Sequence, residues 1–312
     1  MTTKIFNQLN NTKGISTMKN NNSTTTKFFK VFIALFFIQL FSLSSTNAQV
    51  TWLGEKLVQP TGISSDGSII IGNGWLDVNG LSDTTTGHTP PPMMYLENDG
   101  ANLIQAYRWQ NGIVTPLPTL GGAQTEATGI SSDGSIIVGM STNGSLFERS
   151  FVWSSGVMRD LDSTGGTYHH ATGISSDGSI IVGWMFDENS VMHAYRYKNG
   201  VMTDLGTHGG IESKANGISS DGSIIIGDYK TADGKTHAFR WTESGGMTEL
   251  SELECSATGI VSDGSIIVGM KTEAGITKAF RWTESGGMRD LDSNSGNDWI
   301  VCGIVSDGSI IV

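Results

Sequence analysis

The sequence "GISSDGSIIVG" stands at residues 129–139 and again at residues 173–183. Close copies begin at four other glycines: Gly62, Gly217, Gly259 and Gly303. Counted from the aspartate of each "SDG", the copies follow one another at steps of 67, 44, 44, 42 and 44 residues. A repeat of this length predicts one supersecondary unit per copy, stacked on its neighbours, because a single unit cannot bury its apolar face alone.

Each copy predicts four short strands. In the third copy "ATGIS" ends before an Asp-Gly pair, and "SIIVGW" follows, rich in the β-branched residues that favour strands. "HAYRY", residues 193–197, alternates as a third strand, and "KNG" separates it from "VMTDL", the fourth. The Asp-Gly and Asn-Gly pairs predict two-residue hairpin turns with positive φ.

A single sheet of this kind has two half-apolar faces, and radial packing of several sheets buries both. We therefore expect an all-β fold, a β-propeller of four-stranded blades with about 44 residues per blade, five complete and one incomplete. The sixth copy stops at Val312, which predicts a piece of a longer propeller or a truncated reading frame. A β-solenoid is the alternative, although solenoid coils are usually shorter and need no paired hairpin turns.

The first 48 residues differ from the rest. They contain five lysines and no acidic residue, an apolar run at residues 31–43, and small residues up to Ala48. This order predicts a secretory signal peptide with cleavage after Ala48, and residues 49–312 as the repeat domain. An uncleaved anchor is the alternative, but the run of 13 residues is short for a membrane span of about 20. Met18 is an alternative start. The expected location is secreted or cell surface.

The net charge of the chain is −11 at pH 7, and loss of the five leader lysines would make it −16. This acidity argues against nucleic acid and anionic membranes as partners. The two cysteines, Cys255 and Cys302, could pair in an exported protein or remain separate thiols. Their surroundings contain no Cys–His spacing typical of zinc sites.

Two recurring motifs have structural interpretations. The "SDG" aspartates suggest calcium, but one carboxylate per hairpin supplies too few of the six to eight oxygens required, so turn chemistry is favoured. The "FRW" positions, such as those around Arg240, recur at one place in each copy, which indicates packing between blades. We expect the acidic residues Asp204, Glu249 and Asp290 to pair with such arginines across blades.

Function is expected where the copies differ, on the loops after the second and fourth strands, which share one rim. The largest loop is an insertion at residues 73–105. The candidate ligand-binding side chains are Trp75, His88, Met93, Met94, Tyr95, Tyr168, His169, His170, His208 and Trp299. His169 and His170 would face opposite ways on a strand, which argues against a shared metal. The sequence contains no nucleophile–base motif and no phosphate loop, so we assign no catalytic residue and no cofactor.

The motifs "HAYRY", "HAFRW" and "KAFRW", with "ESGGM" and "GISSDGSIIVG", resemble the HAF-repeat family of extracellular repeat proteins. The resemblance covers about residues 50–312. The second copy departs from it with "RSFVW", and the fifth has Lys278 in place of His. The resemblance implies a secreted or surface location and no established chemistry.

Three functions remain open at this point. The first is a non-catalytic binding or adhesion module for an extracellular glycan or protein. The second is a glycan-acting hydrolase or lyase with carboxylates from different blades, such as Asp187, Glu188, Glu212 or Asp233. The third is a structural spacer. An exposed aromatic patch without a close carboxylate pair would favour binding, and a carboxylate pair in a cleft would favour the enzyme.

Overall fold

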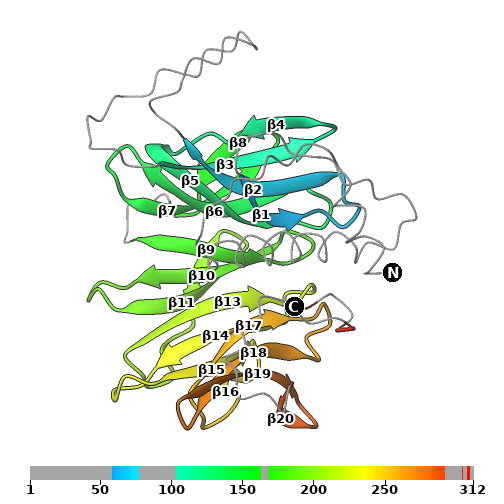
Figure 1. The fold of residues 1–312 in the computed structure, drawn as a ribbon. Helices are drawn as coiled ribbons and strands as arrows, with labels where there is room; N and C mark the ends of the chain where they lie inside the picture. The colour runs from blue at the N-terminus through cyan, green and yellow to red at the C-terminus, as the bar shows by residue number, and fades with distance from the viewer. Residues whose placement is uncertain (1–57, 77–102, 163–167, 292–303, 305–307, 310–312) are drawn as a thin grey trace, which may run out of the picture. The chain divides into compact units, whose positions relative to one another are not determined.

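The computed structural model describes residues 58–76, 103–162, 168–291, 304 and 308–309. The described chain is all-β, with five four-stranded antiparallel sheets that follow one another in the sequence (Figure 1). All of it belongs to one unit, Leu40–Val312. The predicted leader, its cleavage site and most of the sixth copy lie outside the described residues.

In every sheet the strands lie side by side in chain order. The first sheet contains β1 (Val58–Ile63), β2 (Ile69–Leu76), β3 (Leu103–Gln110) and β4 (Ile113–Pro116). The second contains β5 (Gly121–Ile130), β6 (Ile136–Asn143), β7 (Glu148–Ser154) and β8 (Val157–Asp160). The third contains β9 (His169–Ile174), β10 (Ile180–Phe186), β11 (Met192–Lys198) and β12 (Val201–Asp204). The fourth contains β13 (Glu212–Ile218), β14 (Ile224–Lys230), β15 (Thr236–Thr242) and β16 (Gly246–Glu249). The fifth contains β17 (Cys255–Ile260), β18 (Ile267–Glu273), β19 (Ile276–Thr283) and β20 (Gly287–Asp290).

The four strands predicted for each copy are confirmed in these five copies, and one of the two turn lengths is wrong. Asn199 and Gly200 form the predicted two-residue hairpin, with φ of 53° and 81°. The Asp-Gly turn is longer, because Ser175 N donates to the carbonyl oxygen of Ile180 and leaves four residues between them. Hydroxyl and carboxylate groups close this longer loop.

Ser175 and Asp177 provide that closure. The Ser175 hydroxyl accepts a hydrogen bond from Ile180 N at 3.0 Å and donates one to Asp177 Oδ1 at 2.6 Å. The same oxygen accepts from Ser179 N at 3.0 Å. The Ser175 hydrogen bond, followed by those from Ser179, lowers the pKa of Asp177. The carboxylate is thus used inside its own turn, as the turn interpretation of "SDG" predicted.

Two glycines of the repeat are required for different reasons. Gly178 has φ of 75°, in the region that glycine adopts most readily, and a Cβ there would lie 2.5 Å from Ile136 Cδ1 of the preceding sheet. Gly183 faces a register shift in β9, and a Cβ there would lie 2.0 Å from the backbone oxygen of His170. A side chain tip can move out of the way, whereas a paired strand backbone cannot.

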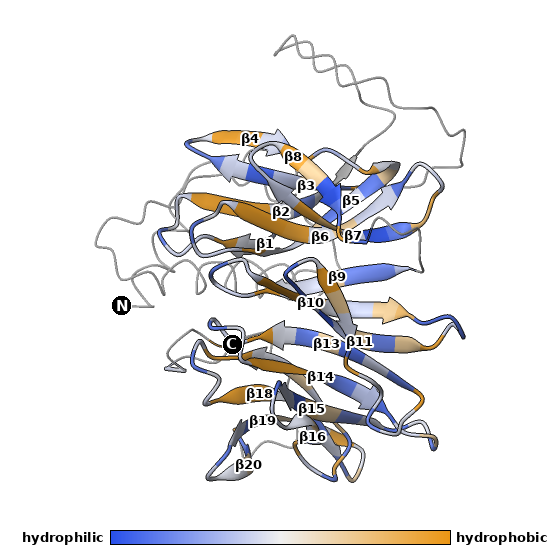
Figure 2. Cartoon of the chain, turned by 180° about the vertical axis from the view of Figure 1, so that it is seen from behind, coloured by the Kyte–Doolittle hydropathy of each residue, from blue (hydrophilic) through white to orange (hydrophobic). Residues whose placement is uncertain are grey.

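The core lies between successive sheets, at contacts that we call junctions and number from one to four in chain order. At the second junction, Val138 and Leu161 of the second sheet pack against Ala171 and Ile181 of the third. The second strands carry the apolar "SIIVG" segments, and β2, β6, β14 and β18 show them as continuous orange in Figure 2. Among the described residues, each sheet therefore buries apolar side chains against its neighbours in the chain, as the repeat predicted.

Backbone hydrogen bonds also cross each junction at equivalent places. Ser132 N donates to Ser176 O at 2.9 Å, and Ser176 N donates to Ser220 O at 2.9 Å. The same bond joins Ser65 to Ser132 and Ser220 to Ser262. Because these atoms belong to the Asp-Gly turns, the turn end of every sheet is fixed in the same way to the next.

The first residue of the "HAF" motif pairs within its own sheet. His193 Nδ1 lies 2.6 Å from Asp204 Oδ2, which belongs to the adjacent fourth strand. Other copies repeat the pair with Arg149 and Asp160, His237 and Glu249, and Lys278 and Asp290. Arg149 and Lys278 thus keep a basic group beside an acidic one, whereas Gln105 at this position of the first copy donates to the backbone oxygens of Ala106 and Leu117. Our prediction that Asp204, Glu249 and Asp290 pair with arginines across sheets is wrong, because the hairpin register brings the nearer base to them.

Two arginines of the "FRW" positions, Arg108 and Arg196, pack on the next sheet, as predicted. The guanidinium of Arg196 lies 5.4 Å from the ring centre of Trp241, and Arg108 lies 5.6 Å from that of Trp153. Cysteine pairing stays a prediction: Cys255 is a buried free thiol whose pKa burial raises to about 11, and Cys302 lies outside the described residues.

Candidate functional site

The copies differ most at the end of the sheets opposite the Asp-Gly turns, which we call the loop end. Residues 44 positions apart are equivalent in the second, third and fourth copies. In the fourth sheet such positions on β13 and β14 form two cross-strand ion pairs, Glu212 with Lys230 at 3.4 Å and Lys214 with Asp228 at 3.8 Å. The equivalent residues of the third sheet, Tyr168, Phe186, His170 and Trp184, are all aromatic.

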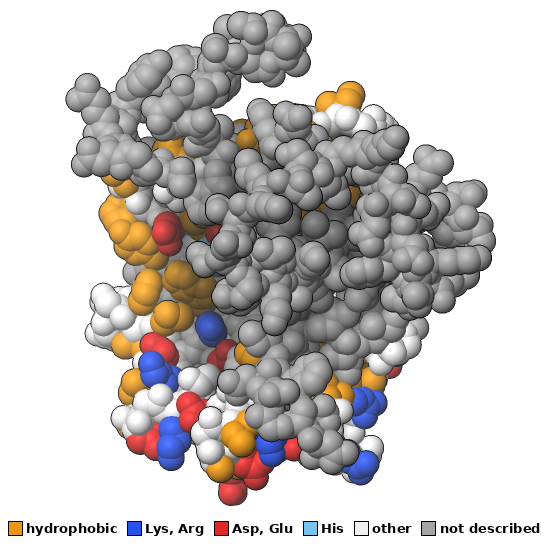
Figure 3. All heavy atoms as spheres, in the orientation of Figure 1, with side chains coloured by type: hydrophobic (Ala, Val, Ile, Leu, Met, Phe, Trp, Pro, Cys, Tyr) orange, Lys and Arg blue, Asp and Glu red, His pale blue; other side chains and the backbone are white. Residues whose placement is uncertain are grey.

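We define the aromatic patch as Leu146, Phe147, Tyr168, Trp184 and Phe186. Ring centres are separated by 5.4 Å between Phe147 and Tyr168, 6.4 Å between Tyr168 and Phe186, and 5.7 Å between Phe186 and Trp184. All three contacts are edge-to-face, a favourable aromatic geometry. Figure 3 shows hydrophobic side chains gathered on the left of the view, beside β7, β9 and β10 of Figure 1. The second and third sheets therefore share one apolar surface.

Three members of the aromatic patch are exposed: Leu146 at 61%, Phe147 at 45% and Tyr168 at 39% of their surface. Trp184 and Phe186 are half-buried beneath them. Large apolar side chains held together at the surface are typical of binding sites, whereas single exposed ones are common everywhere.

Leu146 stands in an unfavourable backbone conformation. It has φ of 66° in the hairpin that joins β6 and β7, where Asn143 Oδ1 accepts hydrogen bonds from Ser145 N and Phe147 N. The equivalent positions hold Ser190 with φ of 61° and Gly234 with φ of 85°. A left-handed conformation costs a bulky L-residue roughly 1–2 kcal/mol relative to glycine. Hairpin formation does not require leucine, since glycine makes the same turn two copies later.

His170 and Glu126 lie at the edge of the aromatic patch. The His170 ring lies on Trp184 with ring centres 5.4 Å apart and an interplanar angle of 31°. Its Nε2 lies 3.9 Å from Glu126 Oε2 on the first strand of the preceding sheet. These two polar groups are half-buried, and they provide a polar contact beside the apolar surface.

Carboxylate residues adjoin the rings in the sequence. Glu148 follows Phe147 directly, and Asp187 and Glu188 follow Phe186. Asp187 Oδ1 accepts hydrogen bonds from Asn189 N and Val191 N, and the Val191 bond lowers its pKa most. Between residues 144 and 191 the only lysine or arginine residues are Arg149 and Arg159. The aromatic patch is thus apolar at its centre and acidic at its margin.

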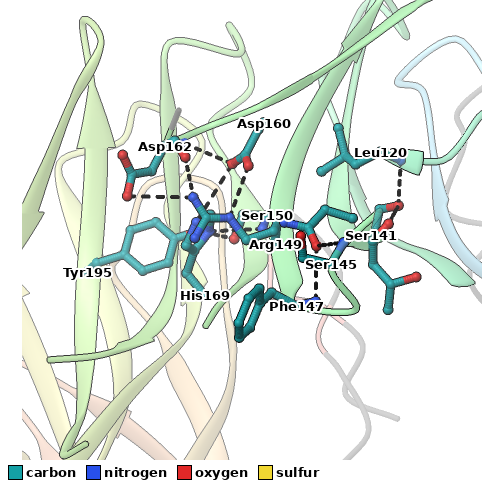
Figure 4. Close-up of polar contacts among 12 residues, drawn as sticks. Leu120, Ser141, Ser145, Phe147, Arg149, Ser150, Asp160, Asp162, His169 and Tyr195 are labelled. Carbon is teal, nitrogen blue, oxygen red and sulfur yellow. Dashed lines mark hydrogen bonds and ion pairs between the residues drawn. The ribbon is translucent and has the colours of Figure 1, made fainter. Parts of the chain in front are cut away.

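A Ser, His and Asp set lies beneath the aromatic patch, but its geometry is structural (Figure 4). His169 Nδ1 accepts a hydrogen bond from the backbone N of Ser150 at 2.8 Å, while the Ser150 hydroxyl is 2.9 Å from Tyr195 OH. The histidine therefore does not contact the hydroxyl that it would have to activate. Ser150, His169 and Tyr195 are all buried, so a substrate has no access.

This buried cluster includes a fixed charge. Arg149 is 2% exposed, and its Nε donates to Asp160 Oδ2 at 2.9 Å while its Nη2 contacts the backbone oxygen of Asp162. His169 Nε2 lies 3.7 Å from Asp160 Oδ1. Burial, and then the Arg149 charge, lower the pKa of His169 to about 4. The histidine is neutral at pH 7 and serves as a hydrogen-bond acceptor between two sheets.

The structure brings together some of the predicted site residues and separates others. Tyr168 lies in the aromatic patch and His170 beside it, while His169 faces the opposite, buried side of β9, as strand alternation predicted. His208 is exposed, with its ring 5.0 Å from that of Tyr229 at the third junction. Trp75 lies on β2, but its side chain is outside the described set, as are the whole residues His88, Met93, Met94, Tyr95 and Trp299.

Sequence reasoning missed Leu146, Phe147, Trp184 and Phe186. Loop length drew attention to the insertion instead, and most of that insertion, residues 77–102, lies outside the described residues. A comparison of equivalent positions would have found the four, because Phe186 corresponds to Lys230 and Trp184 to Asp228.

The carboxylates of the enzyme alternative are engaged separately. Asp187 is held in its own hairpin, Glu212 contacts Lys230, and Asp233 accepts from Thr231 Oγ1 at 2.5 Å. Glu188 is exposed beside Asp187. Among the described residues, no group of three or more His, Cys, Asp or Glu side chains is arranged to hold a metal ion.

An open pocket of about 460 Å³ lies at the turn end of the third junction. Arg196, Arg240, Trp241 and Glu243 line it. Arg196 already pairs with Glu243 at 3.1 Å and packs on Trp241, so sheet packing explains these groups.

Several solved structures are similar to this chain. A TolB-like protein of Agrobacterium tumefaciens matches with a TM-score of 0.53 and 16% identity, over 83% of this chain and 90% of its own. TolB of Acinetobacter baumannii matches with a TM-score of 0.50 and 15% identity, over 78% of this chain and 56% of its own. A prolyl endopeptidase structure matches with a TM-score of 0.50 and 12% identity, over 75% of this chain and 35% of its own.

These likenesses concern the fold alone, and they support a propeller scaffold. No protein-family model matches the sequence. No curated protein matches it either. Within the described residues, no helix has the length and apolar character needed to cross a membrane.

Proposed function

We propose that this chain is an exported, non-catalytic binding protein built on a β-propeller, and that it belongs with the HAF-repeat proteins that its motifs resemble. The radial layout is supported by the packing of each four-stranded sheet on the next and by the likeness to TolB-like propellers. Export is supported by the basic, apolar and small-residue order of residues 1–48.

The aromatic patch is the observation that carries the binding proposal. Three of its rings, Tyr168, Trp184 and Phe186, occupy loop-end positions where the next copy has salt-bridged polar residues, so the fold does not need rings there. Exposed apolar surface costs solubility, and it persists at a surface where a ligand covers it. The nearby Ser–His–Asp set is buried and wrongly oriented for attack, which favours binding over catalysis.

The ligand classes to be tested are extracellular glycans and proteins. The acidic charge of the chain would repel nucleic acid and anionic lipid surfaces. Aromatic side chains can bind either a sugar ring or an apolar residue of a protein, so the proposal covers both.

The test is an array of glycans and extracellular-matrix proteins probed with the full chain. We expect specific binding that is lost in a Phe147→Ser, Tyr168→Ser double variant. Val201→Ser is the matched control, because Val201 is also exposed, at 61%, but lies in the Asn-Gly hairpin outside the aromatic patch. The proposal fails if the parent binds nothing on the array, or if the double variant binds as well as the parent.

A further inference from the structure

We propose that the aromatic patch is a docking site for a protein segment that presents an apolar side chain flanked by Lys or Arg residues. This inference rests on the proposed binding function and narrows its ligand class. Three features of the loop end carry it: the conformation of Leu146, the chemistry of the exposed rings and the charge of the margin.

Leu146 is unfavourable both in its backbone conformation and in its exposure to solvent. It is a bulky residue with φ of 66°, and it exposes 61% of its surface. Gly234, at the equivalent position two copies later, makes the same turn without either cost. A residue that is both strained and exposed is best explained by a contact outside the fold, because strain of this kind concentrates at functional sites.

The exposed chemistry fits a protein better than a glycan. Leu146 and Phe147 contain no polar atom in their side chains that could bond a sugar hydroxyl. The rings meet edge-to-face, at interplanar angles of 76° and 88°, and so do not form one flat platform for a pyranose. Protein interfaces, in contrast, have apolar and aromatic anchors at their centre and a polar margin.

The acidic residues at the edge of the aromatic patch favour a positively charged partner. Glu126 lies beside His170, Glu148 follows Phe147, and Asp187 and Glu188 follow Phe186. Arg149, two residues after Phe147 in the sequence, is 2% exposed and paired with Asp160, so it does not offset this charge at the surface. A partner with basic residues around its anchor is complementary, whereas a second copy of this chain would bring the same acidic margin and be repelled.

The experiment is selection of a phage-displayed random dodecapeptide library on the full-length chain. Selected peptides are expected to contain an apolar residue with Lys or Arg within a few positions, and to bind less tightly as salt is raised. Leu146→Gly should weaken a selected peptide about tenfold or more, the loss of one interface anchor. It should not lower the melting temperature, because glycine relieves the backbone. The matched control is Ser190→Gly, the same change one copy later, which should leave peptide affinity unaltered.

Each other outcome overturns the inference. Selected peptides without basic residues, or equal affinity of the parent and Leu146→Gly, would remove the docking site as described. A dimer of the parent in sedimentation that Leu146→Gly abolishes would assign the surface to a second copy instead. If no peptide is selected but a glycan binds in the array above and depends on Phe147 and Tyr168, this inference fails and the proposed binding function stands.

Discussion

The second and third junctions share the same main-chain contacts, but the sheets that they join carry different side chains at the loop end. At both, a serine N–H of one Asp-Gly turn donates to a serine carbonyl of the next. At both, a third-strand N–H donates to a side chain of the next first strand, Ser150 to His169 Nδ1 and Ala194 to Ser213 Oγ, each at 2.8 Å. The loop end then differs, with aromatic rings on the third sheet and ion pairs at the equivalent positions of the fourth. The main chain fixes the assembly, and side chains at the loop end are free to vary.

The largest effect is expected from a substitution that disrupts the strand pairing common to all the sheets. Gly183→Ala places a Cβ 2.0 Å from the backbone oxygen of His170, so β9 and β10 must separate locally. We expect a loss of about 4 kcal/mol in the free energy of unfolding, measured by urea titration. Gly200→Ala is the control, since Gly200 has φ of 81° and no other atom within 4 Å of the position that a Cβ would take, and should cost only about 1 kcal/mol. Equal losses would contradict the close approach described for Gly183.

Acid should weaken the second junction more than the third. His169 has a folded-state pKa of about 4, below the unfolded value near 6.5, so the unfolded chain takes up its proton first as pH falls. This group therefore contributes full stability above pH 6.5, and up to about 3 kcal/mol of it is lost between pH 6.5 and 4. The test is urea unfolding across this range for the parent and for His169→Ser, which copies Ser213 of the third junction. His169→Ser should lower stability at neutral pH and flatten the pH slope, whereas an unchanged slope would show that His169 is not the responsive group.

A buried contact and a partly exposed one should respond differently when the carboxylate is neutralised. Asp160→Asn removes the negative charge that faces the Arg149 guanidinium, which is 2% exposed, and we expect a loss of about 2 kcal/mol in the free energy of unfolding. Asp204→Asn at the next copy should cost less than about 1 kcal/mol, because Asp204 is 42% exposed and solvent screens its contact with His193. Thermal melts of the two variants compare them, and equal losses would show that burial of the base does not matter.

The smallest effect is expected from an exchange at the loop end. Ser190→Leu copies Leu146 into the third sheet, where the hairpin already has φ of 61°. We expect the melting temperature to correspond to a change within about 0.5 kcal/mol, the usual range for surface substitutions. A large destabilisation would mean that Leu146 is accommodated by packing peculiar to its own copy.

Much of the fold was predictable because local chemistry repeats in it. Asn-Gly and "SIIVG" encode a turn and a strand wherever they occur, and the period of 44 residues implies the stacked sheets. The length of the Asp-Gly turn was not predicted. The Ser175 hydroxyl accepts the hydrogen bond from Ile180 N in place of a backbone carbonyl, and a hairpin pattern in the sequence does not reveal this. The partner of Asp204 was misassigned, since the register of β11 and β12 decides it and a one-residue difference in loop length conceals it.

The candidate site was less predictable than the fold. Tyr168 and His170 were named from their loop, but the surface that they join includes Phe147 and Phe186 from other strands. The burial of His169 depends on Ser150 and Tyr195 of two different sheets, which no local pattern specifies. Such contacts follow from the packing of sheets, and only equivalent positions in other copies provide a hint of them in the sequence.

The serine-to-serine bond between turns has a consequence for how such a chain can evolve. The donor and the acceptor are main-chain atoms of the same serine in the Asp-Gly turn. Each repeat therefore carries both the group that binds the next sheet and the group that binds the preceding one. A copy duplicated within the gene would arrive with an edge that fits the sheet before it and an edge that fits the sheet after it. Recombination can therefore lengthen the array in single steps without inventing an interface, and each new copy is then open to acquire a surface of its own.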